Sequence, residues 1–137
     1  QQDQYIEHEN VSRPEMECDS YIDFDIKEIS GREKLCYKIS SNKLNVSFLI
    51  ENRGKMIEGL RIFAIGTDEY IYITNNSFAI ENTKIRKGET VKNSVIFEVE
   101  EGFDLSQVEF IPKLNTTNKN NFLCVAGILV KTNVAKC

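Results

Sequence analysis

Residues 43–54 constrain the fold more than any other stretch of the chain. Apolar side chains recur at every second position from Leu44 to Ile50, and polar or charged side chains mostly lie between them. This period of two is typical of a β-strand with one buried face and one solvated face. Asn52-Arg53-Gly54 interrupts the run, and a second apolar run follows at 59–65. The pattern predicts two antiparallel strands joined by a turn.

The rest of the chain repeats this pattern in short segments. Turn residues separate further stretches in which β-branched and aromatic residues alternate or cluster, at 21–27, 35–39, 69–74, 91–100, 108–112 and 122–130. Pro112 is expected to limit its strand to an edge or a bulge. The last stretch is apolar on both faces, so both faces are expected to be covered. The sequence therefore predicts an all-β fold, an immunoglobulin-like antiparallel β-sandwich of about seven to nine strands.

The length and composition of the chain indicate one globular domain. It has 137 residues, of which 41% are hydrophobic and 28% are charged. Residues 1–17 carry five acidic residues and one basic residue, and we expect them to form an N-terminal acidic tail. Residues 18–137 are then the β-sandwich domain. Because the chain starts with Gln1 and not with Met, we also expect that a preceding segment was removed.

Several functional classes are disfavoured by the same sequence. A net charge of −4 gives no footprint for nucleic acid. The longest apolar candidate, 122–130, is shorter than the roughly 20 residues of a membrane span, so we expect none. His8 is the only histidine, and no nucleophile motif or phosphate loop is present. We therefore expect no catalytic residues, no cofactor and no enzymatic activity.

Four cysteines are present, and disulfides explain them better than a metal site does. Cys18, Cys36, Cys124 and Cys137 show no C-x-x-C spacing. Three pairings are possible. If the first and last strands lie side by side and parallel, Cys18 faces Cys124, and Cys36 and Cys137 lie towards the opposite end. We favour this pairing; the alternative is that the terminal Cys137 cross-links neighbouring copies.

Four matches to Asn-x-Ser/Thr are candidate glycosylation sites, at Asn10, Asn45, Asn75 and Asn115. Because the chain is rich in Asn, some of these matches arise by chance. Asn45 is the most informative, since it lies on the polar face of the strand expected at 43–52. A glycan on this face would project into water.

Two further groups have a functional and a structural interpretation. Asp19, Asp23 and Asp25 place carboxylates close together, but there is no glycine-turn ligand loop, so a solvated acidic face is favoured over a calcium site. We predict no metal site. Tyr70 and Tyr72 share one face of an expected strand, where they suit a binding stripe for sugars or a partner, or simply packing.

The order of these motifs resembles small archaeal pilin-like surface proteins, which have an immunoglobulin-like sandwich and are often made with a class III signal peptide. The resemblance covers roughly residues 18–130. It rests on Cys18, Cys36-Tyr37, Leu44-Asn45-Val46-Ser47-Phe48, Asn52-Arg53-Gly54, Ile57-Glu58-Gly59-Leu60, Lys87-Gly88-Glu89-Thr90, Val108-Glu109-Phe110-Ile111-Pro112 and Cys124. It implies a cell-surface location and a role in filaments or attachment, without catalytic residues.

These observations together favour a secreted structural protein. We expect a pilin-like or filament subunit that assembles with copies of itself through sheet edges and tail contacts. The alternative is a monomeric cell-surface adhesion or carbohydrate-binding module with glycans as partners.

Overall fold

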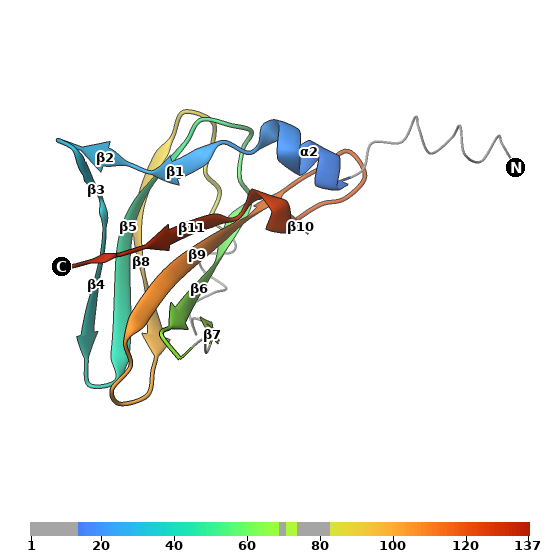
Figure 1. Ribbon diagram of the computed structural model, residues 1–137. Helices are drawn as coiled ribbons and strands as arrows, with labels where there is room; N and C mark the ends of the chain where they lie inside the picture. Colours follow the sequence, from blue (N-terminus) through green and yellow to red (C-terminus); the bar gives the residue numbers. More distant parts are fainter. Residues whose placement is uncertain (1–13, 69–70, 74–82) are drawn as a thin grey trace, which may run out of the picture.

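The computed structural model describes residues 14–68, 71–73 and 83–137, and at 71–73 it describes the backbone only. Within these ranges the chain forms twelve strands, of which four are only two residues long, together with one α-helix and one 3-10 helix (Figure 1). All strand pairs but one are antiparallel. The all-β prediction is therefore confirmed.

The first sheet is built on β5 (Lys43–Asn52), which has neighbours along both edges. β8 (Thr90–Glu98) pairs with one edge along almost its whole length. β4 (Leu35–Ser40) and β1 (Phe24–Ile26) share the other edge, β4 beside 43–48 and β1 beside 50–52. β12 (Ala135–Lys136) adds in parallel to the outer edge of β4.

The second sheet is built on β6 (Gly59–Gly66) and β9 (Leu105–Leu114). β7 (Ile71–Ile73) pairs with the outer edge of β6. β10 (Phe122–Leu123) and β11 (Leu129–Thr132) share the other edge of β9. A short hairpin of β2 (Glu28–Ile29) and β3 (Arg32–Glu33) connects β1 to β4 and forms a sheet of its own.

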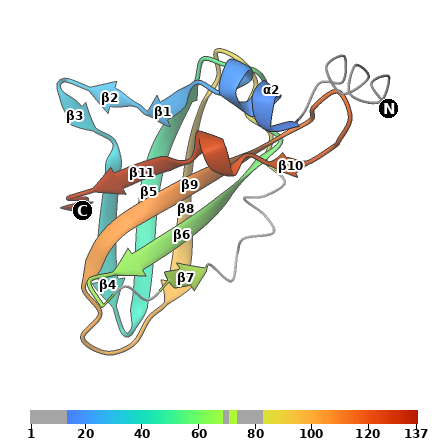
Figure 2. The same ribbon diagram turned by 45° about the vertical axis from the view of Figure 1, so that its right-hand side comes forward.

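The two large sheets pack face to face across one hydrophobic core (Figures 1 and 2). The first sheet contributes the alternating set that the sequence predicts on β5, and all four members are buried: Leu44, Val46, Phe48 and Ile50. The inward set predicted on 91–100 is buried too: Val95, Phe97 and Val99. The ring of Phe48 meets Phe110 of β9 edge to face, with centroids 5.4 Å apart. This contact joins the central strands of the two sheets.

Pro112 does not lie at a sheet edge, so that prediction is wrong. It belongs to β9, where it lies opposite Leu60 of β6. Its carbonyl accepts a hydrogen bond from the N–H of Cys124 at 2.8 Å, so the polar backbone groups of Pro112 face the side of β10 and β11. On that side the 3-10 helix η1 (Val125–Gly127) interrupts the neighbouring strand. The N–H that proline lacks is therefore missing where the strand ladder is already broken.

The strand predicted at 122–130 is also wrong in its extent. The chain instead forms β10, η1 and β11, and Val125 and Val130 are exposed. Gly127 accounts for the close approach at this break, because a Cβ atom there would lie 2.4 Å from Cδ1 of Ile22. The break places η1 against the helix α2 (Pro14–Tyr21). The prediction that both faces of 122–130 are covered is therefore wrong, because other parts of the chain bury only some of these residues.

The helix α2 moves the boundary of the expected acidic tail. Residues 14–17 belong to the folded part of the chain, and Glu17 is buried. Its carboxylate accepts hydrogen bonds from the backbone N–H of Thr117 at 3.0 and 3.1 Å. Residues 1–13 lie outside the described residues.

The turn after β5, at residues 52–55, forms hydrogen bonds that connect the first sheet to α2 and to the segment 85–89. Asn52 is fully buried, and its Nδ2 donates to the carbonyls of Lys55 at 3.0 Å and Ile85 at 2.9 Å. Its Oδ1 accepts from the N–H of Gly54 at 3.0 Å. A Cβ atom at Gly54 would lie 2.3 Å from the carbonyl oxygen of Tyr21, so the turn requires glycine there. The Asn52-Arg53-Gly54 motif is thus a structural junction and not a hairpin turn. The predicted pairing of the strand at 43–52 with the run at 59–65 is wrong, because β5 and β6 lie in different sheets.

Replacing Asn52 by alanine should lower the free energy of unfolding by on the order of 2 kcal/mol, because three hydrogen bonds are lost in a buried site. The carbonyl of Lys55 loses its described partner, whereas the N–H of Gly54 still donates to Asp23 and the carbonyl of Ile85 still accepts from Ile57. Asn93→Ala is the matched control, since among the described residues the side chain of Asn93 bonds to nothing but the adjacent N–H of Ser94. Chemical denaturation of both variants measures the effect. Equal stability of the two variants would contradict this role of Asn52.

Candidate functional site

The structure joins the four cysteines in the two pairs that the sequence analysis favours. Cys18 bonds to Cys124, with Cα atoms 5.8 Å apart, and Cys36 bonds to Cys137, with Cα atoms 4.9 Å apart. The expected reason is wrong for the first pair, because Cys18 lies on α2 and not on a strand. The second pair does lie beside two parallel strands, which are β4 and β12.

The two disulfides differ in exposure. Cys18 and Cys124 are 1% and 0% exposed, inside the contact between α2 and η1. Cys36 is half-buried and Cys137 is exposed. The first bond therefore belongs to the core, and the second is a clasp on the surface that holds the C-terminal strand on the first sheet.

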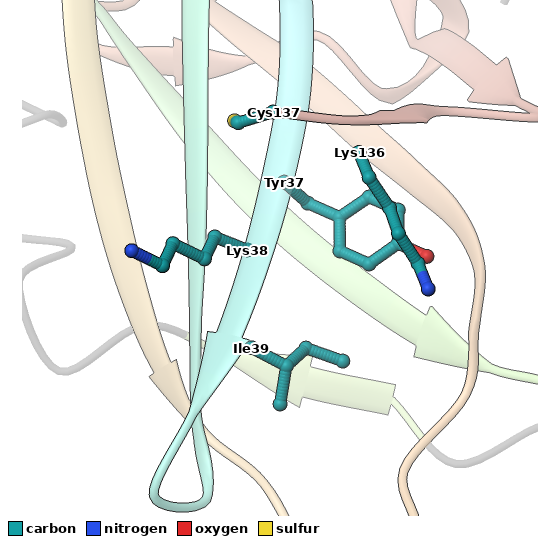
Figure 3. Close-up of a pocket in the computed structure, with 5 residues that line it drawn as sticks. All are labelled: Tyr37, Lys38, Ile39, Lys136 and Cys137. Carbon is teal, nitrogen blue, oxygen red and sulfur yellow. The ribbon is translucent and has the colours of Figure 1, made fainter.

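The edge of the first sheet next to this clasp is hollowed. A hollow of about 400 Å³ is lined by Tyr37, Lys38, Ile39, Lys136 and Cys137. Figure 3 shows Tyr37, Ile39 and Lys136 on one side of β4, whereas Lys38 points to the other side. The N–H of Cys137 donates to the carbonyl of Tyr37 at 2.9 Å. β12 thus covers the edge of β4 only at Cys36 and Tyr37.

Two of the four candidate glycosylation sites are described. Asn45 lies on the outer side of β5, as expected, but it is half-buried and its Oδ1 is buried without a hydrogen-bond partner. Asn115 follows β9, and its Oδ1 accepts from the N–H of Asn121 at 2.9 Å. Asn10 and Asn75 lie outside the described residues. The geometry thus gives Asn45 less freedom to project into water than the sequence suggests.

The three aspartates considered as calcium ligands, Asp19, Asp23 and Asp25, either pair with basic side chains or are exposed to solvent. Asp25 forms an ion pair with Nζ of Lys131 at 3.0 Å, and Asp23 lies 3.6 Å from the Arg53 guanidinium. Asp19 is exposed on α2. In the ranges that the structure describes, no group of three or more His, Cys, Asp or Glu side chains is arranged to hold a metal ion.

Lys131 is the centre of the best-defined charge cluster. Its ammonium group contacts Asp25 of β1 and Glu33 of β3, and so ties β11 of the second sheet to the first sheet and the hairpin. Partial burial acts to lower the pKa of Lys131, but the hydrogen bonds and charges of Glu33 and Asp25 outweigh it and raise this pKa above its ordinary value of 10.5. The cluster is a structural link between elements.

Sequence reasoning missed a basic surface on the outer side of the first sheet. Five cationic side chains gather there, and we call this surface the basic face: Arg32, Lys34, Lys38, Lys43 and Lys92. Four of them lie within residues 32–43, and the pairing of β8 with β5 adds Lys92. A signal was present in part, since Lys38 and Lys43 occupy the polar positions of two predicted strands.

Some of the predictions made from the sequence concern residues that the structure does not describe. Residues 1–13, with His8, and the side chains of Tyr70 and Tyr72 are not among the described groups. Among the residues that are described, no helix has the length and apolar character needed to cross a membrane.

Mild reduction without denaturant should open Cys36–Cys137 before Cys18–Cys124, because thiol–disulfide exchange requires access to a sulfur atom. Alkylation of the freed thiols followed by peptide mass spectrometry identifies the order. In denaturant, where both bonds are accessible, the difference should disappear. Earlier labelling of Cys18 and Cys124 in the native protein would contradict the burial described above.

Replacing Lys131 by methionine should lower the free energy of unfolding by about 1 kcal/mol near neutral pH. Because the pKa of Lys131 is raised in the folded protein, its contribution is fully present below pH 10.5 and is lost as the pH rises above that value. The stability difference between the wild type and Lys131→Met should therefore shrink in alkali. Lys87→Met is the control, and a difference that grows with pH would contradict the assignment.

Comparisons with protein-family models, with curated proteins and with solved structures found no match to this chain. Its function is therefore inferred from its own sequence and geometry.

Proposed function

We propose that this chain is an extracellular structural protein, a pilin-like or filament subunit that assembles with copies of itself through a sheet edge. The observation that carries the proposal is the edge of β4 beside the Cys36–Cys137 clasp. There a disulfide fixes a short strand, and the part of β4 beyond it has no partner strand among the described residues.

The orientation of the β4 backbone supports this assignment. Because the carbonyl of Tyr37 accepts from Cys137, the polar backbone groups of Tyr37 face away from β5. Alternation along a strand gives Ile39 the same orientation, past the end of the pairing with β12. The Ile39 side chain is 41% exposed. An edge with free backbone groups and an exposed apolar side chain is a template for another strand.

The disulfides support an extracellular setting and a mechanical role. Structural disulfides persist in oxidising compartments. The two bonds span sequence separations of 106 and 101 residues, and in the chain-entropy model each closure stabilises the fold by about 5 kcal/mol. Together they fasten α2 and the C-terminus to the sheets. A subunit that bears mechanical tension resists unfolding better when both ends of its folded chain are covalently linked to the sheets.

The finer description follows the resemblance in the sequence. Two facing, mainly antiparallel sheets are consistent with an immunoglobulin-like sandwich, which we propose as the fold type. Asn115, in the loop after β9, is the described residue that best suits a glycan, since its Oδ1 accepts from the N–H of Asn121 and its Nδ2 donates to no described residue. We propose that Asn10 and Asn75 are further candidates.

Replacing Ile39 by lysine should abolish or strongly weaken assembly, because a charge at a strand edge opposes pairing with a second strand. Sedimentation velocity and electron microscopy of the purified chain measure assembly, and thermal unfolding checks that the variant folds. Met16→Lys, which changes an exposed apolar side chain on α2 in the same way, should assemble like the wild type.

Two results would contradict the proposal. A wild-type chain that stays monomeric at high concentration would favour the alternative function, a monomeric adhesion or carbohydrate-binding module. A folded Ile39→Lys variant that assembles like the wild type would show that the β4 edge is not the contact.

A further inference from the structure

The basic face is a track along the outer side of the first sheet. Lys38 lies opposite Asn45, and Asn45 lies opposite Ile96 on the other neighbouring strand. Two residues further along β5, Ser47 lies between Cys36 and Ser94. Each of these positions alternates with a core position, so the register directs them away from the core.

Two hollows follow one another along this track. One, of about 540 Å³, is lined by the cations Arg32, Lys34 and Lys92, by Glu33 and Ser47, and by six apolar residues, one of them a cysteine: Ile29, Leu35, Cys36, Phe48, Leu49 and Ala135. The other, of about 420 Å³, is lined by Lys38, Ser40, Ser41, Lys43, Asn45 and Ile96. Ser47 and Asn45 are two residues apart on β5, which corresponds to about 7 Å. The hollows are therefore close enough for one extended ligand to occupy both.

The cations of the basic face are not neutralised by the described part of the protein. None of the five forms an ion pair with a described residue, although the whole chain carries a net charge of −4. Nearby carboxylates are engaged elsewhere, Glu33 with Lys131 and Glu51 with Lys27. Glu98 lies opposite Lys43 in the register and is the acidic residue at the end of the track. The surface thus favours an anionic ligand.

A second observation points to the kind of ligand. The Oδ1 atom of Asn45, in the middle of the track, is buried and lacks a hydrogen-bond partner. A buried acceptor without a donor costs free energy. Asn45 lines one of the two hollows, so rotation of its amide into that hollow would let a ligand donor recover this cost. Several hydroxyl side chains line the same track: Ser40, Ser41 and Ser47. The track therefore combines cations with groups that bind hydroxyls.

We propose that the basic face binds an acidic polysaccharide, with carboxylate or sulfate groups on the cations and a sugar hydroxyl donating to Oδ1 of Asn45 once the amide has turned into the hollow. Polysaccharides carry both kinds of group along an extended chain. DNA supplies the anions but has no hydroxyl donors along its backbone, and RNA has only one 2′-hydroxyl per nucleotide. This proposal does not depend on self-assembly, because the cations of the basic face lie on the outer side of the first sheet and Ile39 points to the other side of β4 (Figure 3). Lys38 lines both the hollow at the β4 edge and the basic face.

The proposal requires that Asn45 carry no glycan, since a glycan on its Nδ2 would cover both hollows. Intact-mass and peptide analysis of the native protein decides this point. A glycan on Asn45 would overturn the proposal.

Binding is tested by calorimetric titration of the full chain with four probes. These are an oligogalacturonate, which is carboxylated, a heparin oligosaccharide, which is sulfated, neutral dextran, and a single-stranded DNA of matched charge. We expect one or both acidic oligosaccharides to bind, more weakly as salt rises, and dextran not to bind. The two acidic sugars distinguish a carboxylate ligand from a sulfate ligand.

Variants of the basic face assign the site. Lys38→Gln combined with Lys92→Gln should weaken binding of the acidic sugar about tenfold. Lys87→Gln combined with Lys119→Gln changes the net charge equally, away from the track, and should leave the affinity within about twofold. Asn45→Ala should weaken sugar binding about threefold while leaving any DNA binding unchanged.

Three results would overturn the proposal. The first is no binding of either acidic sugar. The second is DNA that binds as tightly as the sugars, which would indicate a nucleic-acid surface. The third is an equal loss of affinity in the two double-lysine variants, which would indicate attraction by net charge alone. Failure of this test leaves the assembly test with Ile39→Lys unaffected.

Discussion

The contact between the inner side of β5 and the second sheet is the constraint on which the rest of the structure depends. β5 is the only described strand of the first sheet that is paired along most of both edges, and each of its inward side chains is buried. The ring of Phe48 packs against the ring of Phe110 in the middle of β9, so the buried face of β5 is in direct contact with the second sheet. Because the side chains of a strand alternate, the choice of inward residues on β5 also decides which residues face out. The core and the basic face are thus two consequences of one register.

The chain ends are held by two bonds of different character. Cys18–Cys124 is buried and joins α2 to η1, where Gly127 and Ile22 also meet. Cys36–Cys137 lies at the surface and fixes a strand of two residues, which is too short to hold its place by backbone pairing alone. The first bond adds to the core, and the second determines how much of the β4 edge is left open.

The strands with clear alternation could be predicted from the sequence, because period two and burial agree along 43–52 and 91–99. Helix α2 was missed since its apolar residues have no helical period. Pro14 at its start and Glu15 and Glu17 in its first turn are helix-start signals that could have indicated it. Pro112 was misplaced because the cost of a proline in a central strand depends on the neighbouring strand, which is broken there by η1. The basic face could be predicted only in part, since four of its cations lie within residues 32–43, whereas Lys92 of β8 joins them only through the pairing with β5.

Native-state hydrogen exchange of the backbone amides tests most directly whether β5 and β9 form the centre of the fold. Amides protected by pairing on both sides and by a buried face open only when the whole domain unfolds. The structure predicts that the slowest amides lie between Leu44 and Ile50 on β5 and around Val108 and Phe110 on β9, and that those of α2 and β12 exchange faster. Slowest exchange in α2 or β12, or equally fast exchange throughout β5, would contradict this account of the fold.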